Sequence, residues 1–251
     1  MIRRVAILST PRSGNTWLRR LLALSFGLSD IAVHRAGDVD WDGLPAGAAL
    51  QLHWPPGAPL LGLLDRHGFR RVTIRRHPLA VLISILHFAP HEAQTSQCLD
   101  RDGGGETPTL DAHPESPEFL SYSTGPWARA LLQVTKEWWP MPGVHRVCYE
   151  DLAANPRERV LRLARELGWD CAKEALERAI AANSMDAMKW HPNRHYWRGE
   201  PDLWKRLLTA PSAKAIWRAH RDVFATLGYE CDADPALQAD EAYRNWLAVR
   251  E

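Results

Sequence analysis

Short apolar runs alternate with longer stretches of helical periodicity along this chain. Four runs have the length and composition of buried strands, at residues 5–8, 48–52, 71–75 and 144–149. Helical patterns predict helices at about residues 18–24, 60–67, 78–87, 119–139, 156–167, 172–182 and 211–226, and another near the C-terminus. Strands that alternate with helices predict an α/β fold whose central, mainly parallel sheet has helices on both faces.

The turn after the first predicted strand is the first candidate site. It spans residues 9–17, contains Gly14, and opens a helix. Such a turn points backbone N–H groups toward one spot, with the positive end of the helix dipole behind them. Arg12 adds a guanidinium suited to phosphate or sulfate oxygens. The turn therefore predicts a site for a phosphorylated ligand, and the alternative is a plain junction capped by Thr16.

The same turn differs from a nucleotide-binding P-loop, G-x-x-x-x-G-K-[ST]. Gly14 and Thr16 occupy the positions of the last Gly and the hydroxyl residue. Asn15 stands at the position of the P-loop Lys, and Ser9 at that of the first Gly. P-loop kinases and ATPases need the Lys and a nearby metal ion on the β- and γ-phosphates. The spacing therefore predicts a P-loop-like site without triphosphate chemistry.

Composition limits the ligands and the location. The 251 residues fit one α/β domain, here taken as residues 1–251, and 31 basic against 30 acidic residues give no general attraction to nucleic acid or acidic membranes. An anionic ligand therefore needs a local cluster of donors. No apolar stretch has the length of a signal peptide or membrane span, and the four cysteines show no metal-like spacing. We expect reduced thiols, no bound metal and a cytoplasmic protein.

One long segment interrupts the alternation. Residues 90–118 are polar and contain several Gly and Pro residues. Loops of this length in a compact domain are commonly lids, binding loops or disordered segments. The composition predicts a mobile insertion, either a lid over an acceptor pocket or a simple linker.

Five segments in order resemble the PAPS-dependent sulfotransferases, where PAPS is 3′-phosphoadenylyl sulfate. Residues 11–17 resemble the family's loop for the 5′-phosphosulfate. Arg76, with Ser84 eight positions later, is similar to its 3′-phosphate motif. The remaining three segments resemble its Tyr-Glu-Asp segment, an adenine-side motif and the late loop over the 3′-phosphate, at residues 149–152, 184–189 and 197–199. The resemblance extends from residue 5 to about residue 230, and it implies the P-loop-like α/β fold of that family.

The resemblance implies transfer of a sulfuryl group from PAPS to a hydroxyl, with PAP, the 3′,5′-bisphosphorylated adenosine, as the second product. It implies that Trp17 stacks on adenine, with Met185 on the other face, and that Arg198 helps to hold the 3′-phosphate. The implied donor-binding set comprises Arg12, Ser13, Gly14, Asn15, Thr16, Trp17, Arg76, Ser84, Tyr149, Met185, Arg198 and Gly199.

His53 follows the second predicted strand and is the candidate general base. Its position matches the family's catalytic His. Arg12 is expected to stabilise the charge that develops on the bridging oxygen. A sulfuryl group carries less charge than a phosphoryl group, so a metal clamp is less necessary. The chain departs from the family at three positions: Arg12 and Gln51 each replace a common Lys, and Trp197 replaces an Arg, for which Arg194 or Lys205 are possible substitutes.

The acceptor is less defined by the sequence. Trp54, His87, Phe88, Tyr122 and Trp127 are the candidate acceptor-binding residues. Their aromatic character favours a phenol, a lipid or another small-molecule hydroxyl, with a glycan as the alternative. Two rival functions remain: a P-loop-like kinase, and a non-catalytic module that binds an adenine nucleotide.

Overall fold

The computed structural model describes residues 2–33, 36–91, 112–184, 187 and 197–250. Contacts divide the chain into two compact units. Unit 1 comprises residues 1–76 and 134–189, and unit 2 comprises residues 77–133 and 190–251. The predicted insertion falls mostly on residues 92–111, which lie outside the described residues, as does Met185.

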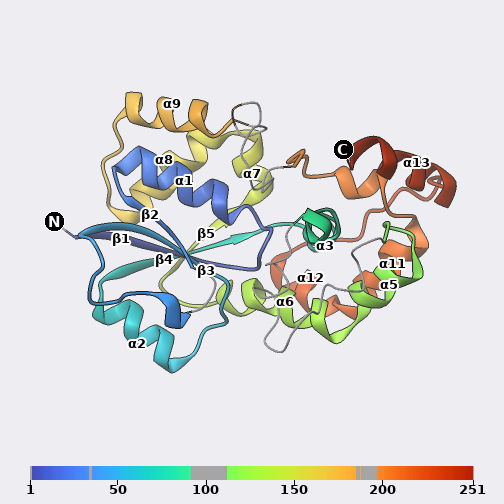
Figure 1. Cartoon of the computed structure of the whole chain (residues 1–251), viewed down its shortest axis with the longest axis horizontal. Helices are drawn as coiled ribbons and strands as arrows, with labels where there is room; N and C mark the ends of the chain where they lie inside the picture. Colours follow the sequence, from blue (N-terminus) through green and yellow to red (C-terminus); the bar gives the residue numbers. More distant parts are fainter. Residues whose placement is uncertain (1, 34–35, 92–111, 185–186, 188–196, 251) are drawn as a thin grey trace. The chain divides into compact units, whose positions relative to one another are not determined.

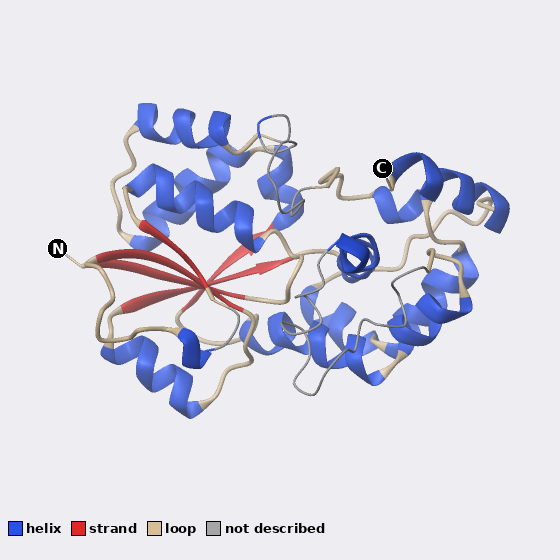
Figure 2. Ribbon diagram, viewed as in Figure 1, coloured by secondary structure: helices blue, strands red, loops and turns tan. Residues whose placement is uncertain are grey.

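Unit 1 is built on a parallel sheet, whose strands are the red arrows of Figure 2. The sheet has five strands in the order β2-β3-β1-β4-β5. The strands are β1 (Arg3–Leu8), β2 (Ser29–Ala32), β3 (Gly47–Leu52), β4 (Phe69–Arg75) and β5 (Val144–Cys148). The predicted α/β fold with a parallel sheet is confirmed.

The alternation of side chains along β1 produces two cores, one on each face of the sheet. Val5 and Ile7 belong to the core beneath α1 (Asn15–Phe26), α8 (Pro156–Leu167) and α9 (Lys173–Ala182), which cover one face (Figure 1). Ala6 and Leu8 belong to the second core, which includes α2 (Ala58–Arg66) and the end of α6 (Pro126–Trp138). Because the central strands are buried on both faces, their sequences read as continuous apolar runs.

Start signals in the sequence agree with the observed helices. Pro78 occupies the first turn of α3 (Pro78–Phe88), as predicted. Asn155 caps α8, and its side-chain oxygen accepts a hydrogen bond from the Glu158 backbone at 3.1 Å. The apolar stripe of α8 faces the core of unit 1.

Unit 2 is helical in its described residues. All eleven residues of α3 are buried, and nine of them are apolar, the exceptions being Ser84 and His87. It packs against the 3₁₀ helix η4 (Leu203–Arg206), and α5 (Pro117–Thr124) packs against α11 (Ala210–Ala219). The remaining elements are the 3₁₀ helix η2 (Ala89–His91), α12 (Arg221–Leu227), α13 (Ala239–Val249) and the first part of α6.

Several predicted boundaries were wrong. The helix expected over residues 119–139 is two helices, α5 and α6, because Gly125 is extended and Pro126 has no N–H to continue α5. The helix expected over 211–226 breaks at His220, between α11 and α12. Tyr149 does not end a strand but opens α7 (Tyr149–Ala154). The sequence also missed β2, a four-residue edge strand with exposed residues.

Candidate active site

The candidate residues of unit 1 follow the carboxyl ends of four neighbouring strands. The turn at residues 9–17, hereafter the donor loop, follows β1, and His53 follows β3. Arg76 follows β4, and Tyr149 follows β5. The register pairs Leu8 with Leu52, so these strands end together. In parallel α/β sheets the usual ligand site lies at the carboxyl ends of the strands, at the point where the strand order reverses.

The donor loop is shaped by hydrogen bonds among its own residues. Asn15 donates from Nδ2 to the Thr10 carbonyl at 2.8 Å, and its Oδ1 accepts from the Ser9 hydroxyl. Asn15 is buried, so the residue at the P-loop Lys position ties the loop together instead of extending toward a triphosphate. Arg12 has a φ of 65°, in the left-handed region, and no other non-glycine residue of the described chain has a positive φ.

The donor loop is also attached to the end of α6. The Thr10 backbone N–H donates to Thr135 Oγ1 at 2.7 Å, and the Thr135 N–H donates to Thr10 Oγ1 at 3.2 Å. Both residues are buried. This reciprocal pair fixes the start of the loop relative to α6.

Tyr149 connects three of the predicted donor-binding residues. Its ring lies edge-on to Trp17, with ring centroids 6.1 Å apart, and beneath the Arg76 guanidinium, whose Cζ is 4.3 Å from the ring centroid. A Cβ on Gly14 would be 2.5 Å from Tyr149 Cδ2. Only glycine therefore allows this approach, and the φ of 94° at Gly14 also favours glycine.

Arg76 joins the end of β4 to the donor loop. Its Nη1 donates to the Arg12 carbonyl at 3.1 Å. Its Nε is buried and has no hydrogen-bond partner among the described residues. Arg76 as a whole is only half-buried, and a guanidinium is suited to binding anionic oxygens. The structure thus brings Arg12, Gly14, Trp17, Arg76 and Tyr149 together at the carboxyl ends of the strands.

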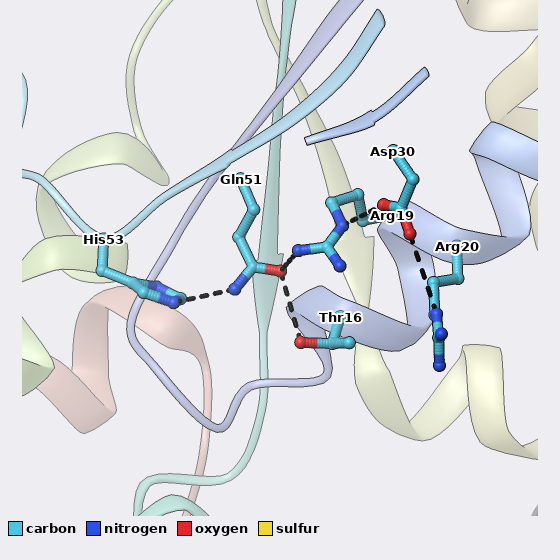
Figure 3. Close-up of polar contacts among 6 residues, drawn as sticks. All are labelled: Thr16, Arg19, Arg20, Asp30, Gln51 and His53. Atoms are coloured by element: carbon cyan, nitrogen blue, oxygen red, sulfur yellow. Dashed lines mark hydrogen bonds and ion pairs between the residues drawn. The ribbon is translucent and has the colours of Figure 1, made fainter. Parts of the chain in front are cut away.

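His53 is half-buried, and both its ring nitrogens are in contact with neighbours. Nδ1 lies 2.8 Å from the carbonyl oxygen of Ser9, the first residue of the donor loop. Nε2 lies 3.0 Å from Nε2 of Gln51 (Figure 3). The predicted general base is therefore attached to the donor loop through Nδ1.

In unit 2 the late loop at residues 197–199 is attached to the end of α13. Trp197 Nε1 donates to the Val249 carbonyl at 2.7 Å, and Arg198 Nη2 donates to the Ala248 carbonyl at 3.3 Å. The Trp197 ring stacks on His87 of α3, with centroids 4.1 Å apart. Gly199 has a φ of 70°, which favours glycine there. Side-chain bonds to the last carbonyls of a helix thus set the position of this loop.

Lys205 pairs with carboxylates of unit 2. Its Nζ lies 2.6 Å from Asp232 and 3.3 Å from Asp202. The hydrogen bond to Asp232 is the main cause that raises the pKa of Lys205. Its charge is thus already matched inside unit 2. Arg194, the other possible substitute for the missing Arg, lies outside the described residues.

The remaining predicted residues are distributed over both units. Ser84, His87 and Phe88 are buried on α3, and Tyr122 is buried on α5. Trp127, at the start of α6, is 44% exposed. In unit 1 the Trp54 carbonyl accepts a hydrogen bond from Trp138 Nε1 at 2.6 Å. Their assignment to an acceptor or to the 3′-phosphate stays a prediction.

Sequence reasoning missed two residues beside the site, Arg19 and Asp30. Arg19 lies on α1 and is only 7% exposed, and it pairs with Asp30 of β2. The available signal was an arginine between the apolar residues Leu18, Leu21 and Leu22 of a core-facing helix, since a buried charge needs a partner. The partner could not be found because β2 itself was not predicted.

The described part of the chain lacks two kinds of feature. Among its residues no group of three or more His, Cys, Asp or Glu side chains is placed to hold a metal ion. Within the same residues no helix combines the length and apolar character needed to cross a membrane.

A family model for the sulfotransferase domain matches residues 59–205, more than half of the chain. The chain belongs to the sulfotransferase domain family. The predicted family and the predicted enzyme class are thereby confirmed. Among curated sulfotransferases, sulfotransferase 1A1 of Canis lupus familiaris is 23% identical over 253 residues, which cover 92% of this chain and 81% of that protein.

Solved structures of similar proteins agree on the fold. Mouse sulfotransferase SULT7A1, crystallised with PAP, superposes with a TM-score of 0.66 at 14% identity, over 89% of this chain and 84% of that one. Retinol dehydratase, solved with androsterone and PAP and also with retinol and PAP, gives a TM-score of 0.56 at 15% identity, over 93% of this chain and 83% of that one. At these identities the likeness shows a shared sulfotransferase fold.

Proposed function

We propose that this sulfotransferase takes its sulfuryl group from PAPS and transfers it to the hydroxyl of a small-molecule, lipid or glycan acceptor, releasing PAP. The observation that carries the choice of donor is Arg76, a half-buried guanidinium bonded to the donor loop. A guanidinium beside a phosphate-type loop supports a ligand with more than one anionic group. The related structures that contain PAP support the same choice.

In this proposal the donor loop holds the 5′-phosphosulfate with Arg12 and the N–H groups of residues 13–16. Trp17 and Met185 contact adenine, and Tyr149 lies beside the nucleoside. The 3′-phosphate is held by Arg76 together with Ser84, Arg198 and Gly199 of unit 2. We also propose that residues 1–251 act as a single functional domain.

The reaction needs one proton transfer and one in-line displacement. The acceptor hydroxyl gives its proton to His53 Nε2 while its oxygen forms a bond to sulfur. The bond from sulfur to the bridging oxygen breaks, and its electron pair goes to the 5′-phosphate of PAP. Arg12 stabilises that developing charge but does not donate a proton, since a guanidinium stays protonated. Holding both oxygens in line supplies part of the acceleration.

The acceptor class that we favour is an apolar molecule that carries a hydroxyl group. The candidate acceptor residues are aromatic at Trp54, Phe88, Tyr122 and Trp127, with His87 beside them in the sequence. Retinol dehydratase, which shares the fold, has been solved with retinol and with androsterone. A panel of phenols, sterol-like alcohols, glycopeptides and sugars, assayed by PAP release from PAPS, would identify the class.

Replacement of His53 by Ala separates an enzyme from a binding module. We expect PAP release to fall about 10²- to 10⁴-fold, the usual contribution of a general base. Binding of PAP, measured by calorimetry, should be retained. His145→Ala is the matched control, because His145 is a half-buried histidine of β5 in the same unit.

Three results would contradict the proposal. Unchanged turnover in His53→Ala excludes His53 as the base. Turnover that requires ATP and Mg²⁺ favours a kinase. Binding of PAP without transfer to any member of the panel favours a non-catalytic nucleotide-binding module.

A further inference from the structure

We infer that Gln51, Arg19 and Asp30 are positioning residues that hold His53 as a neutral imidazole whose Nε2 carries a lone pair and no proton. The inference rests on the proposed role of His53 as the general base. Figure 3 shows the chain of contacts, which runs from Asp30 through Arg19 and Gln51 to His53. All of these residues belong to unit 1.

The Ser9 carbonyl determines which nitrogen of His53 carries hydrogen. A carbonyl oxygen can only accept, so the 2.8 Å contact requires a proton on Nδ1. Asn15 Nδ2 also lies 3.4 Å from Nδ1, but the closer Ser9 carbonyl already requires the proton on Nδ1, and an amide NH₂ group can only donate. That second contact joins two donors and is not a hydrogen bond. In the neutral ring the lone pair is therefore on Nε2.

Arg19 determines the orientation of the Gln51 amide. The guanidinium can only donate, and its Nη1 lies 3.0 Å from Gln51 Oε1. The Thr16 hydroxyl donates to the same oxygen at 3.3 Å. Gln51 therefore presents its NH₂ group to His53, and Gln51 Nε2 donates to His53 Nε2 at 3.0 Å.

Asp30 keeps Arg19 in place. Arg19 Nε donates to Asp30 Oδ1, and Arg20 Nε approaches Asp30 Oδ2 at 3.7 Å. The Arg19 side chain is only 8% exposed, whereas that of Asp30 is 36% exposed. A buried guanidinium needs such a partner, because an unpaired buried charge is strongly unfavourable. The edge strand β2 thus supplies the carboxylate that anchors the chain of contacts.

The arrangement opposes protonation of His53 at rest. A proton on Nε2 would point at the Gln51 NH₂ group, so that two donors face each other. The charged groups of the network are Arg19, Arg20 and Asp30, and Arg12 lies in the adjoining donor loop. During the reaction the acceptor hydroxyl replaces the Gln51 amide at Nε2 and transfers its proton there. The same repulsion then favours release of that proton to solvent, which resets the base.

The test is the protonation of His53 in the ¹⁵N-labelled full chain, followed by long-range ¹H–¹⁵N NMR across pH. His53 resonances are identified by their loss in His53→Gln. At neutral pH we expect the signature of a neutral ring with hydrogen on Nδ1. In Gln51→Glu a carboxylate replaces the amide and can accept from Nε2, so the protonation midpoint of His53 should rise by about 1–3 pH units.

Arg19→Met tests the contact between Arg19 and Gln51. Without Arg19 the Gln51 amide can turn its oxygen toward His53 Nε2, while the Ser9 carbonyl still accepts from Nδ1. With an acceptor at each ring nitrogen the doubly protonated ring is favoured, so the protonation midpoint of His53 should rise. Arg71→Met is the matched control, because Arg71 of β4 pairs with Asp65 elsewhere in unit 1. This variant should leave the His53 resonances unchanged.

Hydrogen on Nε2 of the resting wild type overturns the inference, as does a midpoint that Gln51→Glu leaves unchanged. If Arg19→Met does not fold, Gln51→Glu still decides. The measurement uses neither PAPS nor an acceptor, so its failure is distinct from that of the proposed function. If the protein shows the expected tautomer but binds no PAP, the inference about the hydrogen bonds stands and the proposed reaction is wrong.

Discussion

The donor loop of unit 1 and the late loop of unit 2 are held in different ways. The donor loop is stabilised by its own residues, chiefly the Asn15 side chain, and by residues that follow adjacent strands. The late loop is held by carbonyls at the end of α13, which lie 50 and 52 residues further along the chain. A local motif can therefore specify the first loop. The second depends on a helix that carries no motif at all.

Of the variants that test this comparison, we expect the largest effect on PAP binding from replacement of Arg76, which we assign to the 3′-phosphate. Arg76→Met removes charge-assisted hydrogen bonds worth about 1.5–3 kcal/mol. Binding of PAP should weaken about 10- to 100-fold, while adenosine 5′-phosphate, which lacks the 3′-phosphate, should weaken much less. Calorimetry with both nucleotides checks this result. Equal losses for both would place Arg76 outside the 3′-phosphate site.

The next effect is at Gly14, where the donor loop meets Tyr149. Gly14→Ala puts a methyl group against the Tyr149 ring at a positive φ, and overpacking of this kind costs about 1–3 kcal/mol. Gly27→Ala is the matched control, since Gly27 also has a positive φ but a Cβ added there would meet no atom within 4 Å. Denaturant unfolding should show a greater loss for Gly14→Ala. Equal losses would mean that Tyr149 moves aside without cost.

A smaller effect should follow from the attachment of the late loop. Trp197→Phe keeps the ring that stacks on His87 but removes the hydrogen bond to Val249. A hydrogen bond contributes about 0.5–1.5 kcal/mol, so PAP binding should weaken about 2- to 10-fold with little change for adenosine 5′-phosphate.

Trp138→Phe is the control for Trp197→Phe, because it removes an indole hydrogen bond to the Trp54 carbonyl in unit 1. It should reduce stability without changing the preference for PAP over adenosine 5′-phosphate. If both variants change that preference alike, the attachment to α13 has no specific role.

The smallest expected effect is a pH dependence of the free energy of unfolding, caused by His220 of unit 2. His220 is buried, and burial lowers its pKa below the usual 6.5 although its Nε2 bonds to the Ser123 carbonyl at 2.7 Å. The unfolded chain therefore binds more protons than the native one just below pH 6.5, and stability falls as the pH drops through this range.

For one histidine the slope stays below about 1.4 kcal/mol per pH unit. Denaturant unfolding between pH 7.5 and 5.5 should show a flatter pH dependence in His220→Gln than in the wild type. His67→Gln serves as the control in unit 1. A wild-type slope that survives in His220→Gln would assign the acid sensitivity to another group.

Features set by local sequence could be predicted, whereas features set by contacts between distant residues could not. Strands buried on both faces are continuous apolar runs, so the sequence predicts β1, β3, β4 and β5. It thereby also predicts the carboxyl ends of these strands, where the donor loop and His53 lie. The edge strand β2 has exposed residues and no such run, and Asp30 was missed with it. At the boundary between α11 and α12, His220 contacts the Ser123 carbonyl, a tertiary contact between distant residues that no local pattern shows.

The central claim is that the donor loop and Arg76 together bind an adenosine that carries phosphates at both the 3′ and 5′ positions. Titration of the purified full chain with PAP by calorimetry, beside adenosine 5′-phosphate, tests it most directly. We predict saturable binding of PAP that is at least about tenfold tighter than that of adenosine 5′-phosphate. No heat with PAP, or equal affinity for the two nucleotides, would contradict the account.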